Sequence, residues 1–111
     1  MRQGKIFYND DFVGILTETD EGEYLFVYDK AYIHRFPNQP ITFSMPVSDK
    51  VYMDNRLFPF FEGLIPEGWL LEIASKSWKL NQNDRMGLLL ACCKNCIGAV
   101  SIIPIIDENN K

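Results

Sequence analysis

The first third of the chain alternates between short apolar runs and polar turns, which is the pattern of consecutive β-strands. Apolar runs occupy residues 5–8, 12–17 and 24–28. Turn-forming clusters at residues 9–11 and 19–22 separate these runs. Such short polar connections join neighbouring antiparallel strands, so the pattern predicts two successive hairpins and an antiparallel meander.

The middle of the chain is less regular. Residues 29–36 fit one short helical turn, and Pro37 and Pro40 bracket a loop. Residues 41–44, which read ITFS, predict a further short strand that ends before Pro46.

Helical patterning begins at Pro66, a residue that suits the first position of a helix. The following apolar positions recur at the spacing of one buried helix face: Leu70, Ile73, Ala74 and Ser77. Asn83 or Asp84 can cap a second helix that runs through residues 88–91.

A last strand is predicted over residues 98–103, ended by Pro104, and residues 107–111 form a polar tail. The elements together predict one α+β domain over residues 1–106. Its expected fold is a small, twisted antiparallel sheet with two main helices packed on one face.

Composition narrows the class of protein. The 111 residues suffice for one domain with a single core, and 47% hydrophobic with 23% charged residues is ordinary globular composition. A net charge of −4 gives no basic footprint for nucleic acid or an anionic membrane. No apolar run approaches the length of about 20 residues that a membrane span needs. We therefore expect no direct contact with nucleic acid and no membrane insertion.

Enzyme chemistry finds little support in the sequence. The single histidine, His34, stands in an aromatic-rich stretch and is interpreted as a packing or surface residue. The scattered glycines form no phosphate-binding motif, and neither a nucleophile elbow nor a kinase catalytic loop occurs. The sequence predicts a protein without catalytic residues and without a cofactor.

The three cysteines, Cys92, Cys93 and Cys96, lie within five residues. Cys93 and Cys96 have the C-x-x-C spacing of a zinc or redox pair, but no second pair completes four ligands. We interpret all three as small buried hydrophobes in a reducing cytoplasm and predict no metal site. The acidic clusters at residues 9–11 and 18–23 lack the spacing of a calcium loop and are interpreted as solvated turns.

Three segments together resemble the N-terminal subdomain of the HipA family: PITFSMP at 40–46, FFEGLIPEG at 60–68 and CIGAV at 96–100. HipA proteins are bacterial Ser/Thr kinases that act as toxins in toxin–antitoxin systems. The likeness covers nearly the whole chain, and the second and third segments together are fairly specific. It implies the fold of that subdomain.

The sequence also differs from HipA kinases, and these differences point to a particular function. HipA kinases continue for several hundred residues with a nucleotide site and catalytic aspartates, whereas this sequence covers the first subdomain. Residues 91–95 also replace a glycine-aspartate pair that often precedes the last strand. A freestanding subdomain resembles HipS, the small antitoxin of the tripartite HipBST systems. That resemblance implies an inhibitor of a shortened kinase toxin, HipT, with a HipB-like DNA-binding protein as a third component.

Trp69 is the predicted partner-binding residue, backed by Pro66, Glu67 and Gly68. It precedes Leu70 by one position, hence by about 100° around the helix, on the shoulder of the apolar stripe. Two interpretations remain open: Trp69 packs against the phenylalanines at 58–61, or it anchors the kinase by entering its cleft. Trp78 is predicted to lie in the core.

Three functions compete at this point. The first is a cytoplasmic antitoxin that binds a HipA-like kinase. The second is a structural subdomain, native or excised from a kinase, that completes the kinase fold or docks a DNA-binding partner; the initial Met1 and the polar ending favour a natural product. The third is a thiol or zinc protein built on the cysteines.

Overall fold

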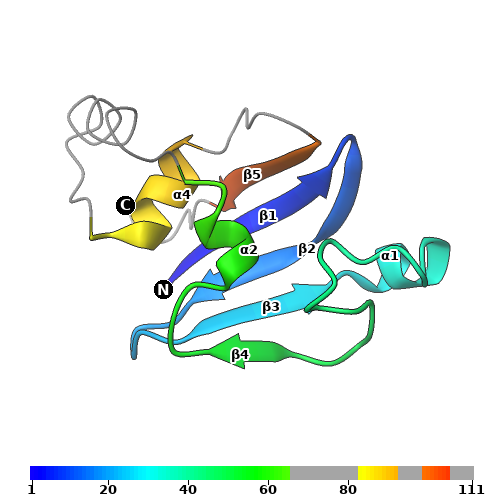
Figure 1. Cartoon of the computed structure of the whole chain (residues 1–111), viewed down its shortest axis with the longest axis horizontal. Coiled ribbons are helices and arrows are strands. Elements are labelled where there is room, and N and C mark those ends of the chain that lie inside the picture. Colours follow the sequence, from blue (N-terminus) through cyan, green and yellow to red (C-terminus); the bar gives the residue numbers. More distant parts are fainter. Residues whose placement is uncertain (66–82, 93–98, 106–111) are drawn as a thin grey trace.

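The computed structural model describes residues 1–65, 83–92 and 99–105. Eight helices and strands are defined within these ranges (Figure 1). In chain order they are β1 (Arg2–Tyr8), β2 (Asp11–Glu18), β3 (Tyr24–Tyr28), α1 (Lys30–Arg35), β4 (Tyr52–Asp54), α2 (Pro59–Glu62), α4 (Arg85–Cys92) and β5 (Val100–Ile105).

The strands form one five-stranded sheet in the order β4-β3-β2-β1-β5, and every neighbouring pair is antiparallel. The predicted meander of the first three strands is therefore confirmed. Each hairpin turn contains a residue in the left-handed region that tight turns require: Asn9 at φ 54° and Gly22 at φ 85°.

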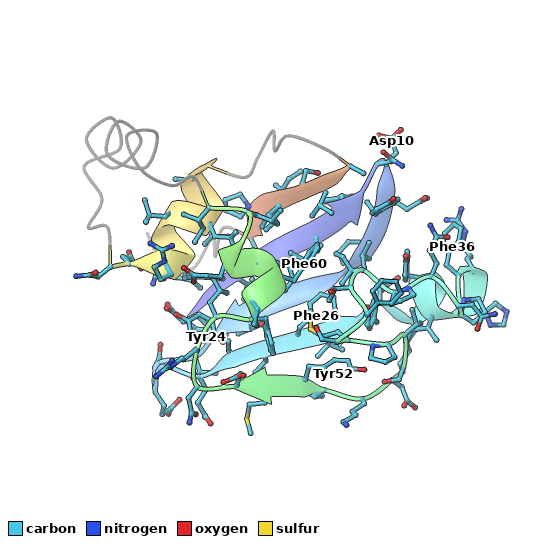
Figure 2. All side chains as sticks on the ribbon, viewed as in Figure 1. Asp10, Tyr24, Phe26, Phe36, Tyr52 and Phe60 are labelled. Carbon is cyan, nitrogen blue, oxygen red and sulfur yellow. The ribbon has the colours of Figure 1, made fainter. Side chains whose placement is uncertain are left out.

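The core lies between one face of the sheet and helices α2 and α4, which both cover that face (Figure 1). Phe26 of β3 packs against Phe61 of α2, with ring centroids 5.7 Å apart; Figure 2 shows Phe26 beneath this helix. Helix α4 adds Met86, Leu88 and Leu89, all fully buried. The α+β class with helices on one face of the sheet is confirmed.

Helix α4 confirms the second predicted helix, and Asp84 proves to be its cap. The Gly87 N–H donates to the Asp84 carboxylate at 3.2 Å, which satisfies one of the free amides of the first turn. The helix predicted to start at Pro66 lies outside the described residues, as does the tail 107–111. The division into a domain over 1–106 and a tail therefore stays a prediction.

The strand predicted at 41–44 is wrong. Residues 42–45 form a turn closed by the Met45 N–H, which donates to the Thr42 carbonyl at 3.1 Å. Ile41 and Met45 are buried while Phe43 between them is 97% exposed, whereas a straight strand would place all three side chains on one face. The true fourth strand, β4, was not predicted because it has only three residues.

The last strand continues through Pro104, where it was predicted to stop. Pro104 pairs with Gly4 of β1, and β5 forms the edge of the sheet. A proline is tolerated there because its missing N–H can face away from the neighbouring strand.

Candidate interaction surface

The four predicted partner-binding residues, Pro66, Glu67, Gly68 and Trp69, lie outside the described residues. The chain leads into them from Ile65, which is only 2% exposed and belongs to the core. Trp78, Cys93 and Cys96 also lie outside the described ranges. Cys92 is the last residue of α4.

The remaining chemical candidates are at the surface. His34 lies exposed in the last turn of α1, in agreement with a surface residue. Asp10 points outward at the tip of the β1–β2 hairpin (Figure 2). Within the described ranges, no group of three His, Cys, Asp or Glu side chains has the arrangement of a metal site.

The face of the sheet opposite α2 and α4 carries many apolar side chains. Strand register places its side chains in three rows across the sheet. We call these residues the open sheet face: Met53, Leu25, Thr17, Gln3 and Ile105 in the first row, Val27, Ile15, Lys5 and Ile103 in the second, and Phe12, Phe7 and Ser101 in the third.

Apolar side chains dominate the open sheet face, and several are accessible. Met53 is 63% exposed, Ile103 40% and Val27 38%. Lys5 is the one charged residue in the three rows, in a chain whose net charge is −4. Helices α2 and α4 both cover the opposite side, and the described helix α1 lies at the end of the sheet (Figure 1). A face of this composition suits the interior of a protein–protein interface.

A second feature, on the helix side, is a cluster of paired charges. The Arg2 guanidinium donates to both oxygens of Asp84, at 2.9 and 2.7 Å, and to Glu18 at 2.7 Å. These hydrogen bonds from Arg2 lower the pKa of the Asp84 carboxyl below its usual range. The cluster ties β1 to the start of α4, so its role is to fix the helix on the sheet.

Beside this cluster, Arg85 of α4 donates to Glu62 of α2 at 2.6 Å. The pair borders an open cavity of about 490 Å³, whose other lining residues are Gly22, Tyr24, Asn55, Arg56, Leu57 and Pro59. Because Glu62 neutralises Arg85 locally, the ion pair serves to join the two helices.

Comparison with known proteins identifies the family of the chain. A sequence model described as the HipA N-terminal domain matches residues 4–103. The chain belongs to the HipA N-terminal domain family. This finding confirms the resemblance seen in the three sequence segments.

Two relatives extend the match. The chain is similar to an uncharacterized protein of Haemophilus influenzae, with 32% identity over 102 residues and 92% of each chain covered. It is also similar to a solved structure titled "N-terminal domain of HipA toxin", with a TM-score of 0.74 and 28% identity. That match covers 97% of this chain and 96% of the other. The fold is therefore that of a HipA N-terminal domain.

The open sheet face was not predicted from the sequence, although a signal for it exists. Each of three strands carries consecutive apolar residues: Ile15-Leu16, Leu25-Phe26-Val27 and Ile102-Ile103. Strict alternation would indicate one solvated face, whereas apolar neighbours are typical of strands covered on both sides. In this HipA N-terminal domain, helices α2 and α4 cover only one side.

No helix in the described part of the chain is both long and apolar enough to cross a lipid bilayer.

Proposed function

We propose that this HipA N-terminal domain is an antitoxin that binds and inhibits a HipA-like Ser/Thr kinase toxin of the HipT type. A HipB-like DNA-binding protein would be the third component of such a tripartite system. The proposal is supported by the family membership and by the similarity to the N-terminal domain of a HipA toxin. A chain that resembles the kinase's own first subdomain can bind where that subdomain packs.

The observation that carries the proposal is the apolar composition of the open sheet face. Val27 and Ile103 are 38% and 40% exposed, so covering the rest of each side chain in a complex would contribute up to about 1 kcal/mol, a fraction of the value for full burial. Lys5 would need an acidic partner group, because burying an unpaired ammonium is costly. A partner with an apolar surface and one carboxylate therefore fits this face.

Inhibition requires more than binding, and we assign it to the segment 66–69. Pro66, Glu67, Gly68 and Trp69 follow in sequence directly on Ile65, which is buried in the core. In the proposed complex, the indole of Trp69 enters or borders the kinase cleft and excludes substrate or nucleotide. Truncation of such an anchor costs about 2–4 kcal/mol of binding free energy.

A second function, that of a structural subdomain, is favoured by the match to a kinase's own domain. In that role the chain would complete a kinase fold or dock the DNA-binding partner without blocking catalysis. In this role too, the open sheet face would pack against an apolar surface of the partner. The effect on the kinase activity distinguishes the two functions.

Co-expression with a HipA-like kinase from the same genome separates these functions. Growth rescue supports the antitoxin, whereas binding that leaves the toxicity intact supports the structural subdomain. Trp69→Ala should abolish rescue while circular dichroism and melting remain unchanged. A variant that unfolds, or that still rescues, contradicts the role of Trp69.

The open sheet face is tested separately with Ile103→Glu, which places a carboxylate among apolar neighbours. Asp10→Lys, at the exposed hairpin tip, is the control for a change of surface charge. We expect Ile103→Glu to lose kinase binding and Asp10→Lys to retain it, with both variants folded. Equal binding by the two variants contradicts the use of this face.

A further inference from the structure

The loop between α1 and β4 contains a long uncharged segment. Residues 36–48 read FPNQPITFSMPVS, with Arg35 and Asp49 as the flanking charges. Three prolines, at positions 37, 40 and 46, restrict the backbone of this segment. An uncharged surface loop is unusual in a chain with 26 charged residues among 111, counted as 11 basic plus 15 acidic.

Three tyrosine hydroxyls hold this loop in one conformation. Tyr28 of β3 donates to the Met45 carbonyl at 2.5 Å and accepts from the Ile41 N–H at 3.0 Å. Tyr32 of α1 donates to the Gln39 carbonyl at 2.7 Å. Figure 2 shows Tyr52 on β4, the third of these side chains. We call residues 39–46, which contain these contacts, the braced loop.

Tyr52 completes the bracing by donating to the Pro46 carbonyl at 2.6 Å. The tyrosines also support one another: the rings of Tyr28 and Tyr32 stack with centroids 5.9 Å apart, and Tyr52 meets Tyr28 edge to face at 6.5 Å. Tyr28 and Tyr32 belong to the buried core, and Tyr52 is packed against it. The loop is therefore fixed from three elements of the domain.

The braced loop presents one large apolar side chain to solvent, beside small or polar ones. Phe43, in the middle of the turn 42–45, is 97% exposed. Ile41 and Met45, on either side of it, are 9% and 3% exposed and act as anchors in the core. The turn cannot bury Phe43 without pulling out Ile41 or Met45, so the loop holds the phenyl ring in water.

We propose that Phe43 is a preformed anchor that inserts into an uncharged apolar pocket on the kinase partner. This inference rests on the proposed function and adds a second contact beyond Trp69. A ring held in place by the braced loop loses little conformational freedom on binding, which raises affinity. Aromatic residues surrounded by uncharged neighbours are the usual composition of interface centres.

The chemistry of the loop selects a protein as its partner. Nucleic acid and anionic lipid surfaces are bound through lysine and arginine side chains, and residues 36–48 contain none. A membrane-surface element would also present several apolar side chains along one face, whereas Ile41 and Met45 are committed to the core. A pocket for a single phenyl ring on a folded protein fits the observed geometry.

The test measures the affinity of the full chain for a purified HipA-like kinase from the same genome by isothermal titration calorimetry. Phe43→Ala should weaken binding by about 30-fold or more, the loss typical of an interface hot spot. Phe43→Leu, which keeps an apolar side chain, should lose less. Val51→Ala is the control, because Val51 is 52% exposed but lies outside the braced loop.

The possible results separate this inference from the proposed function. Wild-type protein that fails to bind any such kinase refutes both. Wild-type binding that Phe43→Ala weakens no more than Val51→Ala refutes the inference alone. Sedimentation of the free chain is measured in parallel: a dimer that Phe43→Ala dissociates would identify a second copy as the occupant and overturn the proposal.

Discussion

Tyr28→Phe tests the bracing of the loop most sharply, because it removes one oxygen and leaves the ring. The Tyr28 side chain is 2% exposed, and its ring packs edge to face on Phe26 with centroids 4.9 Å apart. Phenylalanine can keep that packing. The change removes the hydrogen bonds to Ile41 and Met45 and orphans one backbone N–H and one carbonyl.

The expected loss of stability follows from those two groups. Each buried polar group left without a partner costs about 1–3 kcal/mol, and phenylalanine recovers part of this because it has no hydroxyl to desolvate on folding. Tyr28→Phe should therefore lower the free energy of unfolding by about 2–4 kcal/mol. In urea this corresponds to a fall of about 1–2 M in the midpoint. Tyr32→Phe is the matched control: its hydroxyl makes one bond, to the carbonyl of the exposed Gln39, and should cost about 1 kcal/mol or less.

Alkaline pH gives an independent measurement of the same hydroxyl. Burial raises the pKa of Tyr28 to about 12, above the usual value near 10. Because the folded-state pKa is raised, the stabilisation is fully present below about pH 10 and is lost as the pH rises through about 12. The stability difference between wild type and Tyr28→Phe should shrink over this window.

Hydrogen exchange locates the effect, since the Ile41 amide should exchange faster in Tyr28→Phe than in Tyr32→Phe. Unchanged protection of Ile41, together with equal urea midpoints for the two variants, would refute the bracing argument.

Two further predictions concern how the domain is held together. Asp84→Asn keeps a cap on α4 but removes the charge opposite Arg2, so it should cost about 1 kcal/mol or less at pH 7. Because Arg2 lowers the pKa of Asp84, this stability difference between wild type and Asp84→Asn should disappear as the pH falls below about 4 and the wild-type carboxyl protonates. Urea unfolding of both proteins over a series of pH values measures it. A stability difference that stays constant down to low pH would contradict the role of the Arg2–Asp84 pair. Gly14→Ala should cost about 2–3 kcal/mol, because a Cβ there would lie 2.2 Å from the Val27 carbonyl oxygen and force β2 and β3 apart. Gly63→Ala, whose Cβ would meet nothing closer than 3.5 Å, is the control, and equal melting temperatures for the two variants would contradict the packing at Gly14.

The first hairpins and helix α4 could be predicted because their signals are local. Polar turns between apolar runs define β1 to β3, and a capping Asp84 precedes the apolar stretch of α4. The alternation of side chains within a strand does not depend on the rest of the fold. These elements therefore form where the sequence predicts them.

The braced loop could not be predicted, because the contacts that shape it are distant in sequence. Phe43 has the neighbours of a strand residue, yet the bond from Tyr28 to the Met45 carbonyl spans 17 positions. Strand β4 is similarly defined by its pairing with β3 and not by its own three residues. Propensity alone does not indicate either feature.

Of the two surfaces proposed for partner binding, the sequence indicated one. The sequence directed attention to Trp69, which follows a recognisable family segment. The open sheet face needed the strand register, which brings Val27, Ile15 and Ile103 into one row with Lys5 between the two isoleucines. Register depends on the turns and on a bulge between Ile6 and Phe7 that the sequence pattern does not reveal.

Inhibition of kinase activity by the purified chain tests the central claim most directly. Phosphate transfer by a HipA-like kinase from the same genome is measured while this HipA N-terminal domain is added in increasing amounts. We predict that the rate falls and reaches its minimum near one chain per kinase, with Trp69→Ala far less effective. A rate that stays constant under excess chain, although the two proteins bind, would contradict the antitoxin function.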